Sequence, residues 1–239
     1  MATPIKFGTD GWRAIIAAEF TVENVARVTE ATGLWLKERF ENPSVVLGHD
    51  CRFAGELFME TAAKVLLAQG IHVKLSRGFV STPMISLAAN QLGCEVGIIL
   101  TASHNPPSYN GFKLKAKFGG PLEPEKINEV EALIPDTCSI DFNSIDLQAA
   151  QKSGQLEEID IETRYINHVK ANFDLAAIDQ SGLHLMYDAM YGAGQRVMPL
   201  ILPKVSLLHC EHNPSFMGTA PEPIAKNLQE LAQTIKNQG

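Results

Sequence analysis

One short stretch of the chain combines residues that could carry out nucleophilic chemistry. Ser103, His104 and Asn105 follow Val96–Leu100, an apolar run with the composition of a buried strand. A hydroxyl at the carboxyl end of such a strand lies where open α/β sheets bind their ligands. A serine nucleophile also needs a base or a cation to activate it. The sequence therefore makes Ser103 the leading candidate for a reactive group.

The residues after the serine indicate how a cation could reach it. Pro106-Pro107 excludes helix and stiffens the loop, and Asn110-Gly111 favours a tight hairpin turn. The alternating segment that follows is typical of a returning strand. This reversal would bring Lys113 back beside the serine, so Lys113, Lys115 and His104 are the candidates for activating it.

Two other interpretations of the serine follow from its surroundings. Serine, asparagine and proline are common in loops, so an ordinary polar loop also fits the composition. A serine hydrolase is disfavoured, because Ser103 has no Gly-x-Ser-x-Gly elbow around it. Acid and histidine partners in the expected chain order are not evident either.

The stretch resembles the phosphoserine loop of the α-D-phosphohexomutases, the phosphoglucomutase/phosphomannomutase family. The signature of that family is Thr-x-Ser-His-Asn-Pro-Pro followed by Tyr-Asn-Gly-Phe-Lys, and the chain carries it at residues 101–107 and 109–113. A second segment, Phe7-Gly8-Thr9-Asp10-Gly11-Trp12-Arg13, resembles the opening segment of the family, whose arginine reaches the active site. The order and spacing of the two segments also fit.

The resemblance implies an intramolecular phosphotransferase in which Ser103 carries the phosphoryl group. The phosphoserine would phosphorylate a hexose phosphate, form a hexose 1,6-bisphosphate and take back the other phosphoryl group. Lys113 and Arg13 would stabilise charge or relay the hydroxyl proton, and His104 would position the loop or assist proton transfer. Arg13, Asn105 and Lys113 are the expected substrate contacts. The phosphate on Ser103 would be a ligand of Mg²⁺, the cofactor expected in the full-length enzyme.

Asp50 and Arg52 follow another predicted strand, at residues 44–48. The family carries a similar Asp-x-Arg at this place. Shaping the floor of the site, a structural ion pair and direct substrate contact are all open roles for the two residues.

Apolar periodicity around the serine predicts alternating strands and helices. The predicted strands are 7–16, 44–48, 71–75 and 96–100, and the predicted helices are 22–40, 56–69, 84–92 and 124–134. This alternation indicates an α/β fold, with a mixed sheet and helices on both faces. The resemblance implies two consecutive three-layer α/β/α domains, of which the second is incomplete.

A polar segment without a clear apolar pattern marks the expected domain boundary. We place a linker at 141–154, between a first domain at 1–140 that carries the serine loop and a second domain at 155–239. In the second domain, we read the glycine-containing segment 188–194 as a structural strand-to-helix turn.

The composition limits the classes of partner. Hydrophobic residues make up 45% of the chain and charged residues 20%, the profile of a soluble globular protein. A net charge of -7 argues against nucleic acid, whereas a small phosphorylated ligand needs only a few local cations. No apolar run approaches the roughly 20 residues that span a membrane, and no signal-peptide core is evident. We therefore expect no membrane partner and a cytoplasmic location.

Cysteine and histidine do not predict a metal centre. The cysteines at 51, 94, 138 and 210 form no C-x-x-C pair, which disfavours both structural zinc and a disulfide framework. The tetrapeptide His209-Cys210-Glu211-His212 has metal-ligating residue types. Adjacent strand residues point to opposite faces, however, so we disfavour a metal site there.

The sequence stops after a predicted helix at 224–235. In the family, a strand and an Asp-Gly-Asp-x-Asp-Arg loop that holds magnesium come next, and this loop is not in the sequence. We therefore expect an amino-terminal fragment that is inactive alone and that self-associates through apolar surface meant for further domains. The alternative is a non-catalytic phosphosugar-binding or scaffold module. The choice of hexose cannot be read from these residues.

Overall fold

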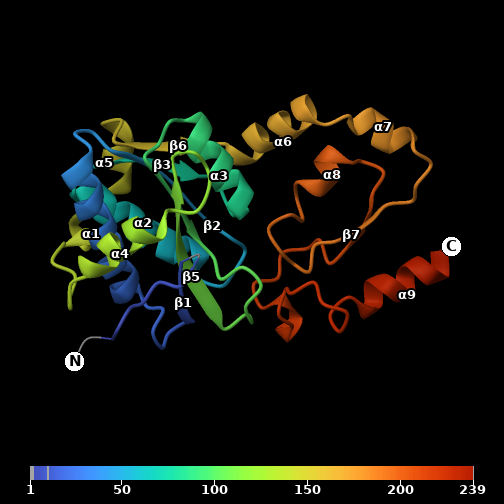
Figure 1. Cartoon of the computed structure of the whole chain (residues 1–239), viewed down its shortest axis with the longest axis horizontal. Coiled ribbons are helices and arrows are strands. Elements are labelled where there is room, and N and C mark those ends of the chain that lie inside the picture. Colours follow the sequence, from blue (N-terminus) through green and yellow to red (C-terminus); the bar gives the residue numbers. More distant parts are fainter. Residues whose placement is uncertain (1–2, 10, 239) are drawn as a thin grey trace.

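A computed structural model of the chain describes residues 3–9 and 11–238, so Asp10 of the opening motif lies outside the described residues. The described residues form a larger amino-terminal unit, blue to yellow in Figure 1, and a smaller carboxy-terminal unit, orange to red. The two units lie side by side in Figure 1.

A mixed sheet forms the centre of the first unit, in the order β1-β5-β4-β2-β3-β6. Its strands are β1 (Trp12–Ile15), β2 (Ser44–His49), β3 (His72–Ser76), β4 (Val96–Leu100), β5 (Tyr109–Ala116) and β6 (Leu156–Ile159). β5 runs antiparallel to both of its neighbours, β1 and β4, whereas β4, β2, β3 and β6 are parallel. Of the expected first strand, 7–16, only residues 12–15 form a strand, which is β1.

Helices cover both faces of this sheet. One face carries α1 (Val22–Arg39), α2 (Gly55–Ala68) and α4 (Pro124–Ala132), and the other carries α3 (Thr82–Gln91) and α6 (Ile161–Asn172). Alternate residues of β4 supply the two cores: Ile98 and Leu100 pack on the α1 side, and Ile99 packs on the α3 side. The predicted α/β class, with a mixed sheet between two helical layers, is confirmed.

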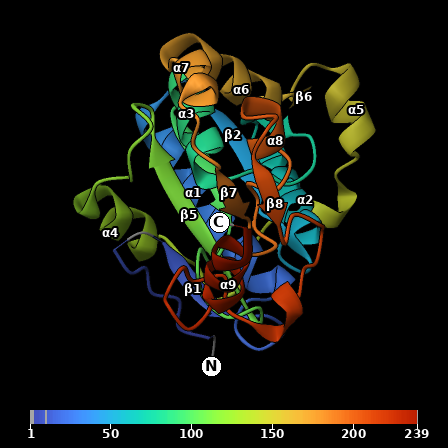
Figure 2. The ribbon, with the colours of Figure 1, turned by 90° about the vertical axis from the view of Figure 1, so that its right-hand side faces the viewer.

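The second unit is a small α/β arrangement. Its strands β7 (Met186–Asp188) and β8 (Ser206–Leu208) are parallel, and its helices are α7 (Leu175–Gln180), α8 (Met198–Ile201) and α9 (Gln229–Gln238). Figure 2 shows this unit in front of the large sheet. In the described ranges, none of the helices is both long and apolar enough to cross a membrane.

β6 bears on the expected domain boundary, which stays a prediction. α5 (Leu147–Lys152) lies in the expected linker, and β6 lies at the expected start of the second domain, yet β6 pairs with β3. Ala150 and Leu156 are buried in the core of the first unit. We therefore propose that the first unit extends to residue 159. The sequence pattern does not predict β6, because it is an edge strand in which Glu157 and Glu158 are exposed.

The expected hairpin turn at Asn110-Gly111 is wrong. Both residues lie inside β5, where Gly111 pairs with Arg13 of β1. The chain reverses earlier, in the loop 101–108, which we call the serine loop. Glycine is needed at 111 because a Cβ atom there would lie 2.5 Å from the Thr101 carbonyl oxygen and 2.8 Å from that of Trp12.

Candidate active site

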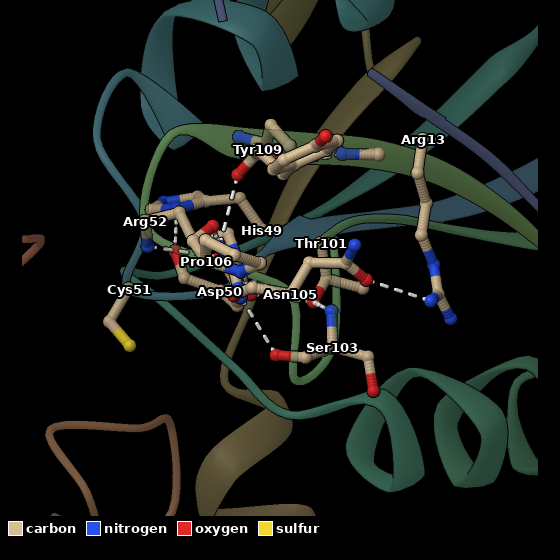
Figure 3. Close-up of polar contacts among 12 residues, drawn as sticks. Arg13, His49, Asp50, Cys51, Arg52, Thr101, Ser103, Asn105, Pro106 and Tyr109 are labelled. Atoms are coloured by element: carbon tan, nitrogen blue, oxygen red, sulfur yellow. Dashed lines mark hydrogen bonds and ion pairs between the residues drawn. The ribbon is translucent and has the colours of Figure 1, made fainter. Parts of the chain in front are cut away.

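Two parallel strands bring the candidate residues to one edge of the sheet. His49 at the end of β2 pairs with Leu100 at the end of β4. Asp50 and Thr101 therefore leave the sheet side by side, at the carboxyl edge where α/β folds bind ligands. Figure 3 shows residues from both segments gathered around the serine loop.

Thr101 connects this edge to the backbone of Ser103. Its hydroxyl donates to Asp50 Oδ2 at 2.5 Å and accepts the Ser103 N–H at 3.0 Å. Ser103 has a left-handed backbone with φ of 57° and an exposed side chain. Its hydroxyl points away from Asp50 and Thr101 in Figure 3. The backbone is thus fixed, and the hydroxyl is presented to solvent.

Arg52 holds the serine loop through its guanidinium group. Its two terminal nitrogens donate to four backbone carbonyl oxygens of the loop and of the start of β5. Nη2 donates to Ser103 and Asn105, each at 2.8 Å, and Nη1 donates to Pro106 at 2.8 Å and Tyr109 at 3.0 Å. A forked cation with this many donors suits a loop whose carbonyl groups turn inward.

Asp50 and Arg52 form a buried ion pair, with 3.3 Å between Asp50 Oδ2 and Arg52 Nε, and the Arg52 side chain is 0% exposed. Burial raises the pKa of Asp50, and the Arg52 guanidinium counteracts this effect. Burial likewise lowers the pKa of Arg52, which Asp50 opposes. Of the roles that the sequence leaves open for Asp50 and Arg52, these contacts indicate a structural ion pair. They also indicate that Arg52 supports the serine loop.

Arg13 reaches the serine loop from β1. Its Nη1 donates to Asn105 Oδ1 at 2.8 Å, and the side chains of both residues converge in Figure 3. This bond places a guanidinium of the opening motif on the same loop as Ser103. Its role toward a substrate stays a prediction.

Lys113 lies inside the sheet and not at the end of a turn. It pairs with Ile99, and only 3% of it is exposed. Gly11 of the opening motif packs directly on it: a Cβ atom at Gly11 would lie 2.8 Å from Lys113 Cγ. The fold thus joins the lysine to the opening motif, whereas His104 is exposed beside Ser103.

Residues of the second unit touch the same region, which the sequence did not predict. Cys51 Sγ donates to the Tyr191 carbonyl oxygen at 3.0 Å, and burial raises the pKa of this thiol to about 12. The Arg52 guanidinium lies over the Phe216 ring, 4.9 Å from its centroid. No periodicity or motif links these positions, so a sequence pattern could not have revealed them.

The donor groups of the described residues do not fit a complete metal site. Across residues 3–9 and 11–238, no three His, Cys, Asp or Glu side chains are grouped so that they could hold an ion. A phosphate on Ser103 would contribute one ligand only.

Comparisons with known proteins match both units. The model described as phosphoglucomutase/phosphomannomutase, alpha/beta/alpha domain I, matches residues 4–139, and that of domain II matches residues 163–239. A phosphoglucomutase/phosphomannomutase of Thermococcus kodakarensis is 34% identical, and the match covers 98% of this chain and 51% of that relative. A phosphoglucosamine/phosphogalactosamine mutase of Sulfurisphaera tokodaii is 30% identical, with coverages of 96% and 50%.

A solved structure gives the same result. A "putative phosphomannomutase" from Thermus thermophilus has a TM-score of 0.86 and 36% identity, covering 98% of this chain and 52% of that one. The chain therefore spans about half the length of the curated relatives that it matches.

Proposed function

The chain belongs to the phosphoglucomutase/phosphomannomutase family, and from this premise we propose that it is the phosphoserine-bearing part of a phosphohexomutase. The observation that carries the proposal is the presentation of Ser103. Its hydroxyl is exposed at the carboxyl edge of β4, while Thr101 and Arg52 hold the backbone on either side of it. Such preorganisation suits phosphoryl transfer, in which positioning and charge stabilisation supply most of the catalysis.

The proposed step moves one phosphoryl group. The Ser103 oxygen attacks a phosphorus atom of a hexose 1,6-bisphosphate, the new O–P bond forms, and the bond from phosphorus to the sugar oxygen breaks. The serine proton passes to a base, and the sugar oxygen leaves as a hydroxyl after protonation. We assign charge stabilisation or proton relay to Lys113 and Arg13, and loop positioning or proton transfer to His104. Arg13, Asn105 and Lys113 are the proposed substrate contacts.

Magnesium would supply charge neutralisation at the transferring phosphate when bound. Since the described residues do not form its site, we propose that the chain by itself turns over hexose phosphates little or not at all. The proposed substrates are hexose phosphate and hexose 1,6-bisphosphate, and the proposed location is the cytoplasm. Self-association through exposed apolar surface is also a proposal, which light scattering at high protein concentration would test.

Intact-mass spectrometry tests the proposal. The chain is incubated with glucose 1,6-bisphosphate and magnesium, and we expect it to gain one phosphoryl group. Ser103→Ala should abolish the gain. Ser108→Ala, at an exposed serine of the same loop, should leave it unchanged and serves as the matched control. A phosphoryl group that persists in Ser103→Ala would overturn the assignment of the carrier.

The same preparation tests the alternative, a phosphosugar-binding or scaffold module. Binding of glucose 1,6-bisphosphate, measured by calorimetry, without any phosphoryl gain would support this alternative over the carrier role.

A further inference from the structure

The nitrogens of the Arg52 guanidinium face groups of the first unit, so the second unit contacts it through a face of the planar group. Its terminal nitrogens are occupied by the four carbonyl oxygens of the serine loop and β5. One face is covered by the Phe216 ring of the second unit, whose centroid lies 4.9 Å from Arg52 Cζ. An aromatic ring over a cation attracts it most strongly where water is excluded, as it is around this fully buried side chain.

Phe216 is buried in a part of its unit where the other described side chains are not. It is 2% exposed, and among the described residues 198–237 it is the only one that is buried. Its backbone and that of Met217 are both left-handed, with φ of 48° and 51°. This conformation is unfavourable for residues other than glycine, and it persists only where the surroundings enforce it. Burial of the ring against Arg52 is the visible compensation.

The contact has a direct route to the reactive serine. The carbonyl groups that Arg52 holds belong to Ser103, Asn105, Pro106 and Tyr109, which span the serine loop and the start of β5. If the ring were removed, water would reach the guanidinium and compete for its donors. The loop would then be held less firmly, and Ser103 would leave its left-handed conformation more often.

We propose that Phe216 is a positioning residue for Ser103, which acts from the second unit by sealing the Arg52 guanidinium against water. Its catalytic meaning rests on the proposed function of Ser103 as the phosphoryl acceptor. The packing of the second unit against Arg52 thereby determines how well ordered the serine loop of the first unit is.

Hydrogen exchange of individual amides tests this inference. In Phe216→Ala, we expect the amides of Ser103, Asn105 and Tyr109 to exchange about tenfold faster, on the scale of a desolvated cation–aromatic contact. The amides of β4 should keep their rates, because the sheet is not part of the contact. Met217→Ala is the matched control, since Met217 is adjacent and 67% exposed. It should leave the loop amides unchanged.

Rescue separates the ring from simple apolar volume. Phe216→Tyr and Phe216→Trp should restore slow exchange in the loop, whereas Phe216→Leu should not. The inference is overturned if the loop amides of Phe216→Ala are unchanged, if loop and β4 amides accelerate equally, or if leucine restores protection as fully as tyrosine.

Phosphoryl transfer gives the second readout. With glucose 1,6-bisphosphate and magnesium, Phe216→Ala should phosphorylate Ser103 about tenfold more slowly than the unaltered chain, and Phe216→Tyr should recover the rate. If the unaltered chain is never phosphorylated while the exchange pattern holds, the proposed function fails and the positioning of the loop stands. If transfer occurs at equal rates in all variants, the positioning role fails and the proposed function stands.

Discussion

Arg13 and Asn105 tie the first strand to the serine loop, through a bond of 2.8 Å from Arg13 Nη1 to Asn105 Oδ1. β1 is an edge strand of the sheet, and β5 lies between it and β4. The bond therefore fixes the loop from one side, while Arg52 holds the same loop from the end of β2. Two guanidinium groups from different segments thus position the serine loop, together with the Thr101 hydroxyl that accepts the Ser103 N–H.

A double-mutant cycle measures the first of these ties. We expect Arg13→Ala and Asn105→Ala to be non-additive in the free energy of unfolding. The coupling energy should be about 1 kcal/mol, because partial exposure to water weakens this bond below the roughly 1.5–3 kcal/mol of hydrogen bonds to charged groups. Urea unfolding of the unaltered chain, the two single variants and the double variant provides the four free energies of the cycle. Strict additivity would show that the bond contributes nothing to the folded state.

Arg52→Lys tests the hold on the carbonyl groups. Lysine keeps the positive charge beside Asp50 but lacks the planar fork that reaches four oxygens, so the free energy of unfolding should fall by about 2 kcal/mol. Arg77→Lys is the matched control, because the Arg77 side chain is 67% exposed and its ion pair, 3.8 Å from Nε to Glu158 Oε2, lies at the surface. It should change the free energy by less than about 0.5 kcal/mol. Equal effects of the two substitutions in urea unfolding would contradict the role given to Arg52.

Gly111→Ala tests the close approach of three backbone segments. The new methyl group would lie 2.5 Å from the Thr101 carbonyl oxygen and 2.8 Å from that of Trp12. Neither backbone can move without disturbing the sheet, so we expect a loss of about 1–3 kcal/mol in thermal or urea unfolding. Gly8→Ala is the comparison, since its Cβ would meet its nearest neighbour at an ordinary 3.6 Å. A Gly111→Ala variant as stable as Gly8→Ala would show that the packing here is looser than described.

Cys51 predicts a dependence of stability on alkaline pH. Burial raises the pKa of its thiol from 9.0 to about 12. Between these values, the folded chain keeps the thiol proton and the unfolded chain releases it. The contribution of this group is therefore fully present below about pH 9 and is lost as pH rises toward about 12.

Cys51→Ser isolates that effect. The serine hydroxyl can still donate to the Tyr191 carbonyl oxygen but does not titrate in this range. We expect the stability of the unaltered chain to fall more steeply than that of Cys51→Ser between about pH 9 and about pH 11 in urea unfolding. Parallel pH profiles would indicate that the thiol is not buried in solution.

The strand and the loop around Ser103 could be predicted because their residues are contiguous in the sequence. The apolar run 96–100 and the prolines after it have local physical meanings, and the structure has β4 at the predicted residues. The turn at Asn110-Gly111 was wrong for a tertiary reason: Gly111 is where β5, Thr101 and Trp12 approach one another. β6 was missed because edge strands need little apolar alternation.

Residues close together in the chain are enough to identify the α/β class, the two family signatures and the serine of the loop. How that serine is held depends on contacts between distant segments, which become visible in the folded chain. Arg52 meets the Ser103 carbonyl 51 positions away, and Phe216 covers Arg52 from a different unit. Such contacts arise from the packing of whole elements. The residue type alone does not distinguish an arginine that faces water from one that contacts four backbone oxygens.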